Sequence, residues 1–249
     1  MTKKKVKKVT TTTTVEYVDS KTNEKTHIIC ILDRSGSMSS IMSDSIGGFN
    51  TFLKQQKDLP DEATITVALF DDNYELIYDN VDIKEAKELT STEWYPRGMT
   101  ALYDAIGKTI NTEKANINKL GKNRPNKVLV CIVTDGLENA SNEFQINDIK
   151  KLIKECENDD WNFIYLAANQ SAFEVGTSFG VSAGNTFTYT ASSAGVNTMN
   201  TKLSKATTMY RSVSTDSIGF ADMSKTLLDD DTDYTSSITT TTDGTSTEK

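Results

Sequence analysis

The sequence predicts an α/β fold: a three-layer, doubly wound, mostly parallel sheet with one antiparallel edge strand and helices on both faces. Three observations lead to this prediction. Short apolar runs alternate along the chain with segments of helical periodicity, which is the pattern of β-α-β units. The longest apolar run, residues 127–136, has no polar alternation, as expected of a strand covered on both faces. Asp72 and Asn73 alone separate two other strand-like runs, which predicts one hairpin and therefore one antiparallel strand.

Six segments are expected to be strands, because they are rich in β-branched and aromatic residues and are bounded by turn formers. They span residues 26–33, 63–71, 74–80, 127–136, 161–168 and 185–190. Six further segments are expected to be helices, because their apolar residues recur at intervals of three or four, as Ile46, Phe49 and Leu53 do. They span residues 41–57, 83–89 (a short helix), 100–117, 146–158, 170–180 and 194–211.

One domain with two polar arms is the expected organisation of the 249 residues. The domain spans residues 26–212. Residues 1–25 form a basic, Thr-rich N-terminal arm that could add an edge strand. Residues 213–249 form an acidic, Thr/Ser-rich tail without an apolar face, for which we predict disorder. Strand-forming arms also suggest an alternative function, a structural or assembly role in which an arm adds a strand to a neighbouring subunit.

Charge and apolar content argue against several classes of protein. A net charge of −8 disfavours nucleic acid as the main partner, since phosphate binding requires concentrated Lys and Arg. Apolar runs fall short of the ~18 residues of a membrane span, and no signal-peptide pattern follows the N-terminal lysines. We therefore expect no membrane partner and a cytoplasmic location. The three cysteines form no C-x-x-C pair and are expected to be buried thiols.

Five oxygen-bearing side chains are expected at one edge of the sheet. Asp33, Ser35 and Ser37 follow the first strand, Thr100 begins a predicted helix, and Asp135 ends the longest strand. In folds of this class, ligands bind beyond the carboxyl ends of the strands. Side chains two residues apart in an extended loop point to one side, so the first three can converge. Each residue alone also has a structural explanation, as a helix cap or a turn former.

Together these residues provide three hydroxyls and two carboxylates, with no sulfur or imidazole. Such hard oxygen donors suit Mg²⁺, Mn²⁺ or Ca²⁺ and disfavour zinc or copper.

Three motifs, DRSGSM (33–38), RGMTALYDAI (97–106) and VTDG (133–136), resemble the loops of the metal-ion-dependent adhesion site (MIDAS) of von Willebrand factor A (vWA) domains. The resemblance covers residues 26–212 and extends to stand-alone bacterial and phage members. It implies that the hydroxyls of Ser35, Ser37 and Thr100 coordinate Mg²⁺ or Mn²⁺, with Ca²⁺ less expected. It implies that Asp33 and Asp135 act through bound water.

The same resemblance implies a non-enzymatic module that binds an acidic side chain of a partner protein. One residue departs from the family pattern: Met99 stands where a glycine often precedes the threonine. This change is expected to affect the flexibility of the loop more than metal ligation.

Enzymatic activity is the less favoured alternative. A Ser/His/Asp hydrolase needs a histidine at the site, but His27, the only one, opens the first strand at the opposite edge. The Gly107-Lys108-Thr109 sequence lacks the first glycine of a phosphate loop and lies inside a predicted helix. Metal-assisted hydrolysis would need a general base, and none stands out beside the hydroxyls, although Asp71 and Asp72 end a neighbouring strand.

Overall fold

A computed structural model describes residues 24–168 and 171–213 of the chain. Within these ranges one six-stranded sheet has the order β3-β2-β1-β4-β5-β6. Its strands are β1 (Thr26–Asp33), β2 (Ala63–Phe70), β3 (Tyr74–Asp82), β4 (Lys127–Thr134), β5 (Trp161–Ala168) and β6 (Thr186–Tyr189). All neighbouring pairs are parallel except β2 and β3, which form the predicted antiparallel hairpin. The predicted α/β class is therefore confirmed.

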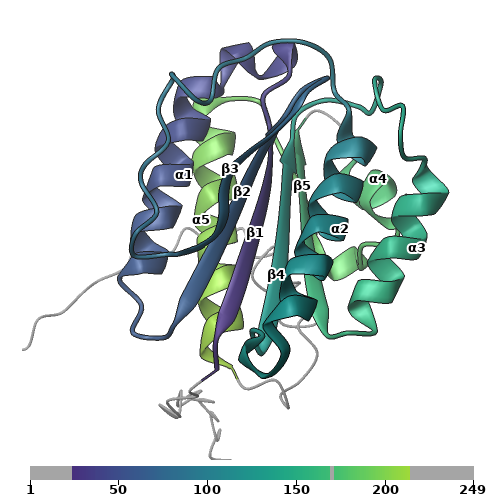
Figure 1. Cartoon of the computed structure of the whole chain (residues 1–249). Helices are drawn as coiled ribbons and strands as arrows, with labels where there is room; N and C mark the ends of the chain where they lie inside the picture. Colours follow the sequence, from purple (N-terminus) through teal and green to yellow (C-terminus); the bar gives the residue numbers. More distant parts are fainter. Residues whose placement is uncertain (1–23, 169–170, 214–249) are drawn as a thin grey trace, which may run out of the picture.

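Helices cover both faces of the sheet (Figure 1). They are α1 (Met42–Lys57), α2 (Leu102–Leu120), α3 (Ile146–Glu157), α4 (Ala172–Ser178) and α5 (Ser193–Ser212), with 3-10 turns η1 (Gly36–Ser40), η2 (Gly121–Asn123) and η3 (Ala183–Asn185). Helices α1 and α5 pack on one face, and α2, α3 and α4 pack on the other. Among the described residues, no helix combines the length and apolarity that a membrane crossing requires.

The two faces of each central strand feed two separate hydrophobic clusters. In β1, Ile28 and Cys30 belong to the cluster beneath α1 and α5, whereas Ile29 and Ile31 belong to the cluster beneath α2 and α3. This double burial explains why the strands read as continuous apolar runs without alternation. All three cysteines are buried and free, as predicted.

One predicted helix is wrong: no helix forms over residues 83–89. The apolar side chains Ile83, Ala86 and Leu89 are buried at helix-like intervals, which misled the prediction. Side chains of α1 satisfy the backbone instead, because Asn50 Oδ1 accepts from Leu89 N–H at 2.9 Å and Asn50 Nδ2 donates to Leu89 O at 2.9 Å. Lys57 likewise donates to Ala86 O. Only one turn forms here, with Ala86 N–H donating to Asp82 O at 3.2 Å, and the α1 side chains satisfy the backbone groups that a longer helix would have paired.

The strand order reverses beside β1, since β2 lies on one side of it and β4 on the other. Loops leaving the carboxyl ends of β1 and β4 therefore diverge to opposite faces, and this leaves a crevice between them. The register pairs Leu32 with Val133, so Asp33 and Thr134 end their strands side by side. The predicted arm strand and disordered tail concern residues 1–23 and 214–249, which lie outside the described ranges, and those proposals and the domain boundaries stay predictions.

Candidate metal site

A continuous set of hydrogen bonds joins four of the five predicted residues. The buried carboxylate of Asp33 accepts Ser35 N–H at its Oδ1 and the Thr134 hydroxyl at its Oδ2, each at 2.6 Å. The Ser35 and Ser37 hydroxyl oxygens lie 3.0 Å apart. Ser37 Oγ in turn donates to Asp135 Oδ1 at 2.5 Å. The first and third loops of the predicted site are thus in direct contact.

The fifth residue, Thr100, reaches the same place across Gly136. A Cβ atom added to Gly136 would lie 2.9 Å from Thr100 Oγ1, 3.3 Å from Ser37 Oγ and 3.8 Å from Ser35 Oγ. Three hydroxyls therefore surround one small space beside Asp135. Ser37 is exposed, so this space opens to solvent. The structure brings all five predicted residues together; their role as metal ligands remains a prediction.

The first loop is not extended, contrary to the argument from its sequence. Ser37 lies in η1, and the tight 3-10 turn brings its hydroxyl back toward Ser35. Ser35 and Thr100 could also have served as helix caps, but the structure shows neither in that role. Ser35 precedes η1 but its side chain makes no capping hydrogen bond, and α2 begins at Leu102 with Ala101, not Thr100, as its N-cap. The hydroxyls of Ser35 and Thr100 are thus free of a capping role.

Electrostatics at the site favour a cation. Among the described residues no ion pair reaches Asp33 or Asp135, because Arg34, the nearest base in the sequence, turns away to Asp71 and Glu75. Burial raises the pKa of Asp33 to about 6, although hydrogen bonds from Thr134 and Ser35 partly oppose this, and burial also raises the pKa of Asp135. Two desolvated carboxylates without a positive partner are unfavourable, and a divalent ion would neutralise them.

The donor set also fits a divalent ion of the magnesium type. It consists of three hydroxyls and two carboxylates, all hard oxygen donors. In the described ranges no cluster of three or more His, Cys, Asp or Glu side chains is placed to hold a metal. The predicted site contains only two such side chains, Asp33 and Asp135, because its other three donors are hydroxyls.

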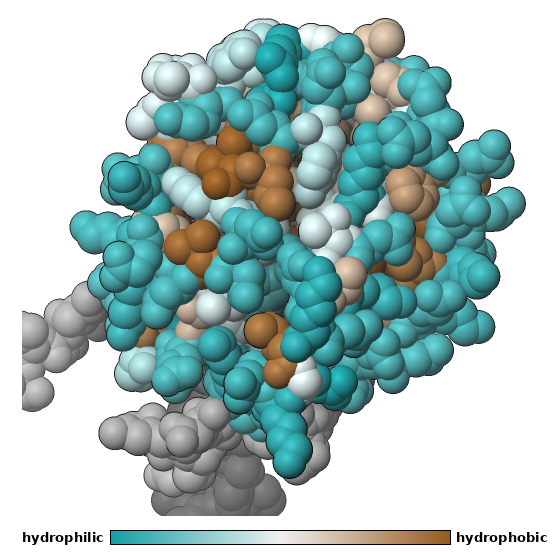
Figure 2. Space-filling view, in the orientation of Figure 1, coloured by the Kyte–Doolittle hydropathy of each residue, from teal (hydrophilic) through white to brown (hydrophobic). Residues whose placement is uncertain are grey.

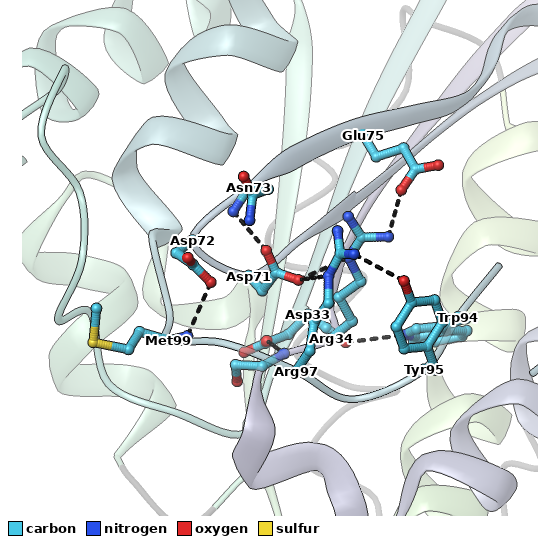
Figure 3. Close-up of polar contacts among 11 residues, drawn as sticks. Asp33, Arg34, Asp71, Asp72, Asn73, Glu75, Trp94, Tyr95, Arg97 and Met99 are labelled. Carbon is cyan, nitrogen blue, oxygen red and sulfur yellow. Dashed lines mark hydrogen bonds and ion pairs between the residues drawn. The ribbon is translucent and has the colours of Figure 1, made fainter.

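A buried ion network that sequence reasoning missed lies beside the site (Figure 3). Asp71, directly after β2, accepts from Arg34 Nε at 3.1 Å and from Arg97 Nε at 2.5 Å through its Oδ2. Its Oδ1 accepts Asn73 N–H at 2.5 Å, and Arg34 Nη1 pairs with Glu75 at 2.6 Å. Asp71 thereby connects the first loop to the segment that leads to Thr100. The signal in the sequence was an arginine placed directly after a buried strand.

The same network makes Asp71 a poor general base. Its carboxylate is fully buried and is neutralised by two guanidinium groups. Asp72 accepts Met99 N–H at 3.3 Å. His27 is buried in β1, 2.9 Å from Glu113 and 2.7 Å from Thr64, at the strand end opposite the site. Asp71 and His27 are thus buried in interactions of their own, whereas Asp72 is exposed.

Backbone contacts hold the second loop against the first. Arg97 N–H donates to Arg34 O at 2.8 Å, and Gly36 N–H donates to Gly98 O at 3.1 Å. Gly98 has a φ of +64°, and a Cβ there would collide with Asp72 Oδ1. The residue that must be glycine is therefore Gly98. This explains why the loop accepts Met99 at the next position.

Gly136→Ala is expected to weaken Mg²⁺ binding about tenfold or more without removing a donor atom, because a methyl group would crowd the three hydroxyls and Mg²⁺ requires near-ideal octahedral geometry. Isothermal titration calorimetry would measure the change. Gly47→Ala is the matched control, because a Cβ at Gly47 meets no atom within 4 Å. Unchanged Mg²⁺ affinity in Gly136→Ala would place the ion elsewhere.

No family model and no curated protein matches the sequence. Solved structures do match. Proximal thread matrix protein 1 (PTMP1) from the mussel byssus, with a zinc-occupied MIDAS motif, is 16% identical with a TM-score of 0.51, and the match covers 74% of this chain and 46% of that chain. The vWF domain of the type V pili tip protein Mfa5 from Porphyromonas gingivalis is 9% identical with a TM-score of 0.54, and the match covers 79% of this chain and 98% of that one.

A third match is the von Willebrand factor type A structure from Catenulispora acidiphila, 15% identical with a TM-score of 0.50 over 73% of this chain and 42% of that chain. The chain has the vWA fold. This confirms the resemblance at the level of fold, which is what identities this low establish. The chain spans less than half of PTMP1, 46% of its length, so the activity and partners of that whole protein do not transfer to it.

The vWA fold accounts for the position of the site. In this fold the crevice at the reversal of strand order lies between β1 and β4, and the five predicted residues leave those strands or the start of α2. The matched structures with the vWA fold include a matrix protein and a pili tip protein, with the MIDAS of one occupied by a metal.

Proposed function

We propose that this chain is a non-enzymatic vWA module that binds a partner protein through a divalent cation. Ser35, Ser37 and Thr100 would hold the ion with their hydroxyls, and an Asp or Glu side chain of the partner would complete its coordination. The observation that carries the proposal is the convergence of these three hydroxyls on one solvent-open space beside Asp135.

The chemistry of the donors favours Mg²⁺ or Mn²⁺ as the ion. Mg²⁺ takes six oxygens in octahedral geometry, and three hydroxyls leave positions for water and for one outside carboxylate. The direct protein ligands would be neutral hydroxyls, with Asp33 and Asp135 acting through bound water, so an anionic side chain that binds the ion directly gains both orientation and attraction. A protein with a net charge of −8 would in this way bind an acidic partner.

The proposal places the protein in the cytoplasm and gives it neither nucleic acid nor membrane as a partner. Three buried, unpaired cysteines support a reducing compartment. The net charge of −8 supports a protein ligand over nucleic acid.

Calorimetry on the full chain with Mg²⁺, Mn²⁺ and Ca²⁺ tests the cation. One saturable site that prefers Mg²⁺ or Mn²⁺ is expected. A pull-down from the native host in Mg²⁺, repeated in EDTA, then tests the partner, and we expect proteins that are retained in Mg²⁺ alone. Absence of uptake of all three ions, or identical retention in EDTA, would contradict the proposal.

A further inference from the structure

Exposed apolar side chains flank the candidate metal site. The described ranges contain five exposed large hydrophobic residues: Tyr95, Met99, Leu120, Leu137 and Phe173. Leu137 is the most exposed of the five, at 62%, and Met99 is next at 56%, equal to Phe173. Met99 directly precedes Thr100, and Leu137 directly follows Gly136. The face shown in Figure 2, by contrast, is mostly hydrophilic with small separate brown patches.

Hydrogen bonds fix the two loops that carry Met99 and Leu137 to each other. Thr100 N–H donates to Asn139 Oδ1 at 2.9 Å, and Asn139 N–H donates to Thr100 O at 3.0 Å. Glu138, next to Leu137, accepts Tyr103 N–H from the first turn of α2 at 3.0 Å. These contacts hold the backbones of both loops in place before any partner arrives. A preorganised contact surface reduces the ordering cost of binding.

The charged side chains near the second loop make contacts other than with the Met99 side chain. Arg97 pairs with Asp71 and donates to the Tyr95 hydroxyl at 2.8 Å, and Figure 3 shows the Met99 side chain directed away from this network. Asp72 is exposed and accepts the backbone N–H of Met99 at 3.3 Å, so its contact is with the backbone of Met99 and not with the side chain. Met99 therefore presents an apolar contact to a ligand that approaches the site.

We propose that Met99 and Leu137 form an apolar rim of the metal site that selects an acidic ligand residue flanked by apolar side chains. The inference rests on the proposed function, because the carboxylate of that residue would bind the cation. The occupant is a loop of a different protein. Charge complementarity supports a carboxylate at the centre of the surface, and the net charge of −8 opposes the close approach of a second copy. The rim then supplies contacts for the residues on either side.

Synthetic nonapeptides test this selection on the full chain. One carries a central Asp between two leucines in a Ser/Gly background; a second has serines in place of the leucines; a third has Asn in place of the Asp. Fluorescence anisotropy in Mg²⁺ would measure binding. We expect the Leu-flanked Asp peptide to bind at least tenfold more tightly than the Ser-flanked peptide, and the Asn peptide not to bind.

Variants of the rim assign the selection to these residues. Met99→Ser with Leu137→Ser is expected to lower affinity for the Leu-flanked peptide to that for the Ser-flanked peptide, with Mg²⁺ affinity by calorimetry unchanged. Leu120→Ser is the matched control, because Leu120 is exposed at the end of α2 that lies away from the site. It should leave both peptide affinities unchanged.

The outcomes separate this inference from the proposed function. Equal binding of both Asp peptides in Mg²⁺, or no binding of either to the Mg²⁺-loaded protein, overturns the rim and leaves the cation site intact. Loss of Mg²⁺ uptake itself overturns both. If Asn replacement of Asp229, Asp230 and Asp231, which follow two leucines, raises peptide affinity, the occupant is the chain's own segment. Mg²⁺-dependent self-association in size-exclusion chromatography would make it a second copy. Either result overturns the assigned occupant.

Discussion

The Thr100→Val variant is expected to lose Mg²⁺ and Mn²⁺ binding by on the order of 100-fold while it keeps its fold. Valine has nearly the shape of threonine, so the substitution removes one oxygen from the three-hydroxyl space and little else. The Thr100 hydroxyl makes no hydrogen bond within the described residues, so its removal leaves no partner unsatisfied there. The loss of affinity would therefore report metal ligation and not misfolding.

Calorimetry and thermal unfolding together check this prediction. Thr207→Val is a matched control, because Thr207 is buried in α5 and its hydroxyl has no partner. The control should keep full Mg²⁺ affinity, and both variants should unfold near the wild-type temperature. If Thr100→Val binds Mg²⁺ as the wild type does, Thr100 is not a ligand.

Asp33 is a less suitable site for such a test than its sequence position suggests. Its carboxylate accepts both Ser35 N–H and the Thr134 hydroxyl. An alanine there would leave the buried Ser35 N–H without its acceptor and the Thr134 hydroxyl with only the longer contact to Gly136 O at 3.2 Å. Each unsatisfied group costs about 1–3 kcal/mol of stability. A weaker metal affinity in Asp33→Ala would then mix ligation with folding.

The Asp71→Ala variant is expected to lose about 3–5 kcal/mol of unfolding free energy, because it removes the only fully buried carboxylate that pairs with the guanidinium of Arg34 among the described residues. Arg97 also loses its carboxylate partner. Since Asp71 connects the first two site loops, Mg²⁺ affinity should fall as well, although Asp71 is not a predicted ligand. Urea unfolding in EDTA measures the first effect without interference from the metal.

Glu75→Ala provides the control for this variant. Glu75 pairs with the same Arg34, but its side chain is 52% exposed. Its removal should cost less than the loss of Asp71, because water screens the half-exposed carboxylate of Glu75, whereas Asp71 is fully buried. Equal losses of unfolding free energy in the two variants would mean that the buried Asp71 stabilises the fold no more than Glu75 does. The network would then not be what positions the two site loops.

The positions of the six strands could be predicted directly from the sequence. β1 and β5 have the predicted bounds, and β2, β3, β4 and β6 differ by one or two residues at their ends. Uninterrupted apolar runs leave a buried strand as the simplest solution, since both faces must be covered. The prediction of a helix over residues 83–89 was wrong, because Asn50 and Lys57, which are distant in the sequence, bond to the backbone of Leu89 and Ala86.

For the candidate site, too, the sequence predicted some features and not others. The types and loop positions of its five oxygen donors could be read from motifs, because strand ends in an alternating α/β chain meet at one edge. The roles of Arg34, Asp71, Arg97 and Thr134 could not. Each acts through a partner tens of residues away, such as the Thr134 hydroxyl on Asp33. No local pattern encodes such a pair.

Local periodicity and donor chemistry were therefore enough to predict the α/β class, the edge that carries the site and the kind of ion it suits. Tertiary packing alone decided how the hydroxyls converge, through the η1 turn and the side chains that meet across Gly136. It also decided that Asp71 is a buried counter-ion and not a base. The reason is physical: periodicity is set by neighbours along the chain, whereas burial and pairing are set by neighbours in space.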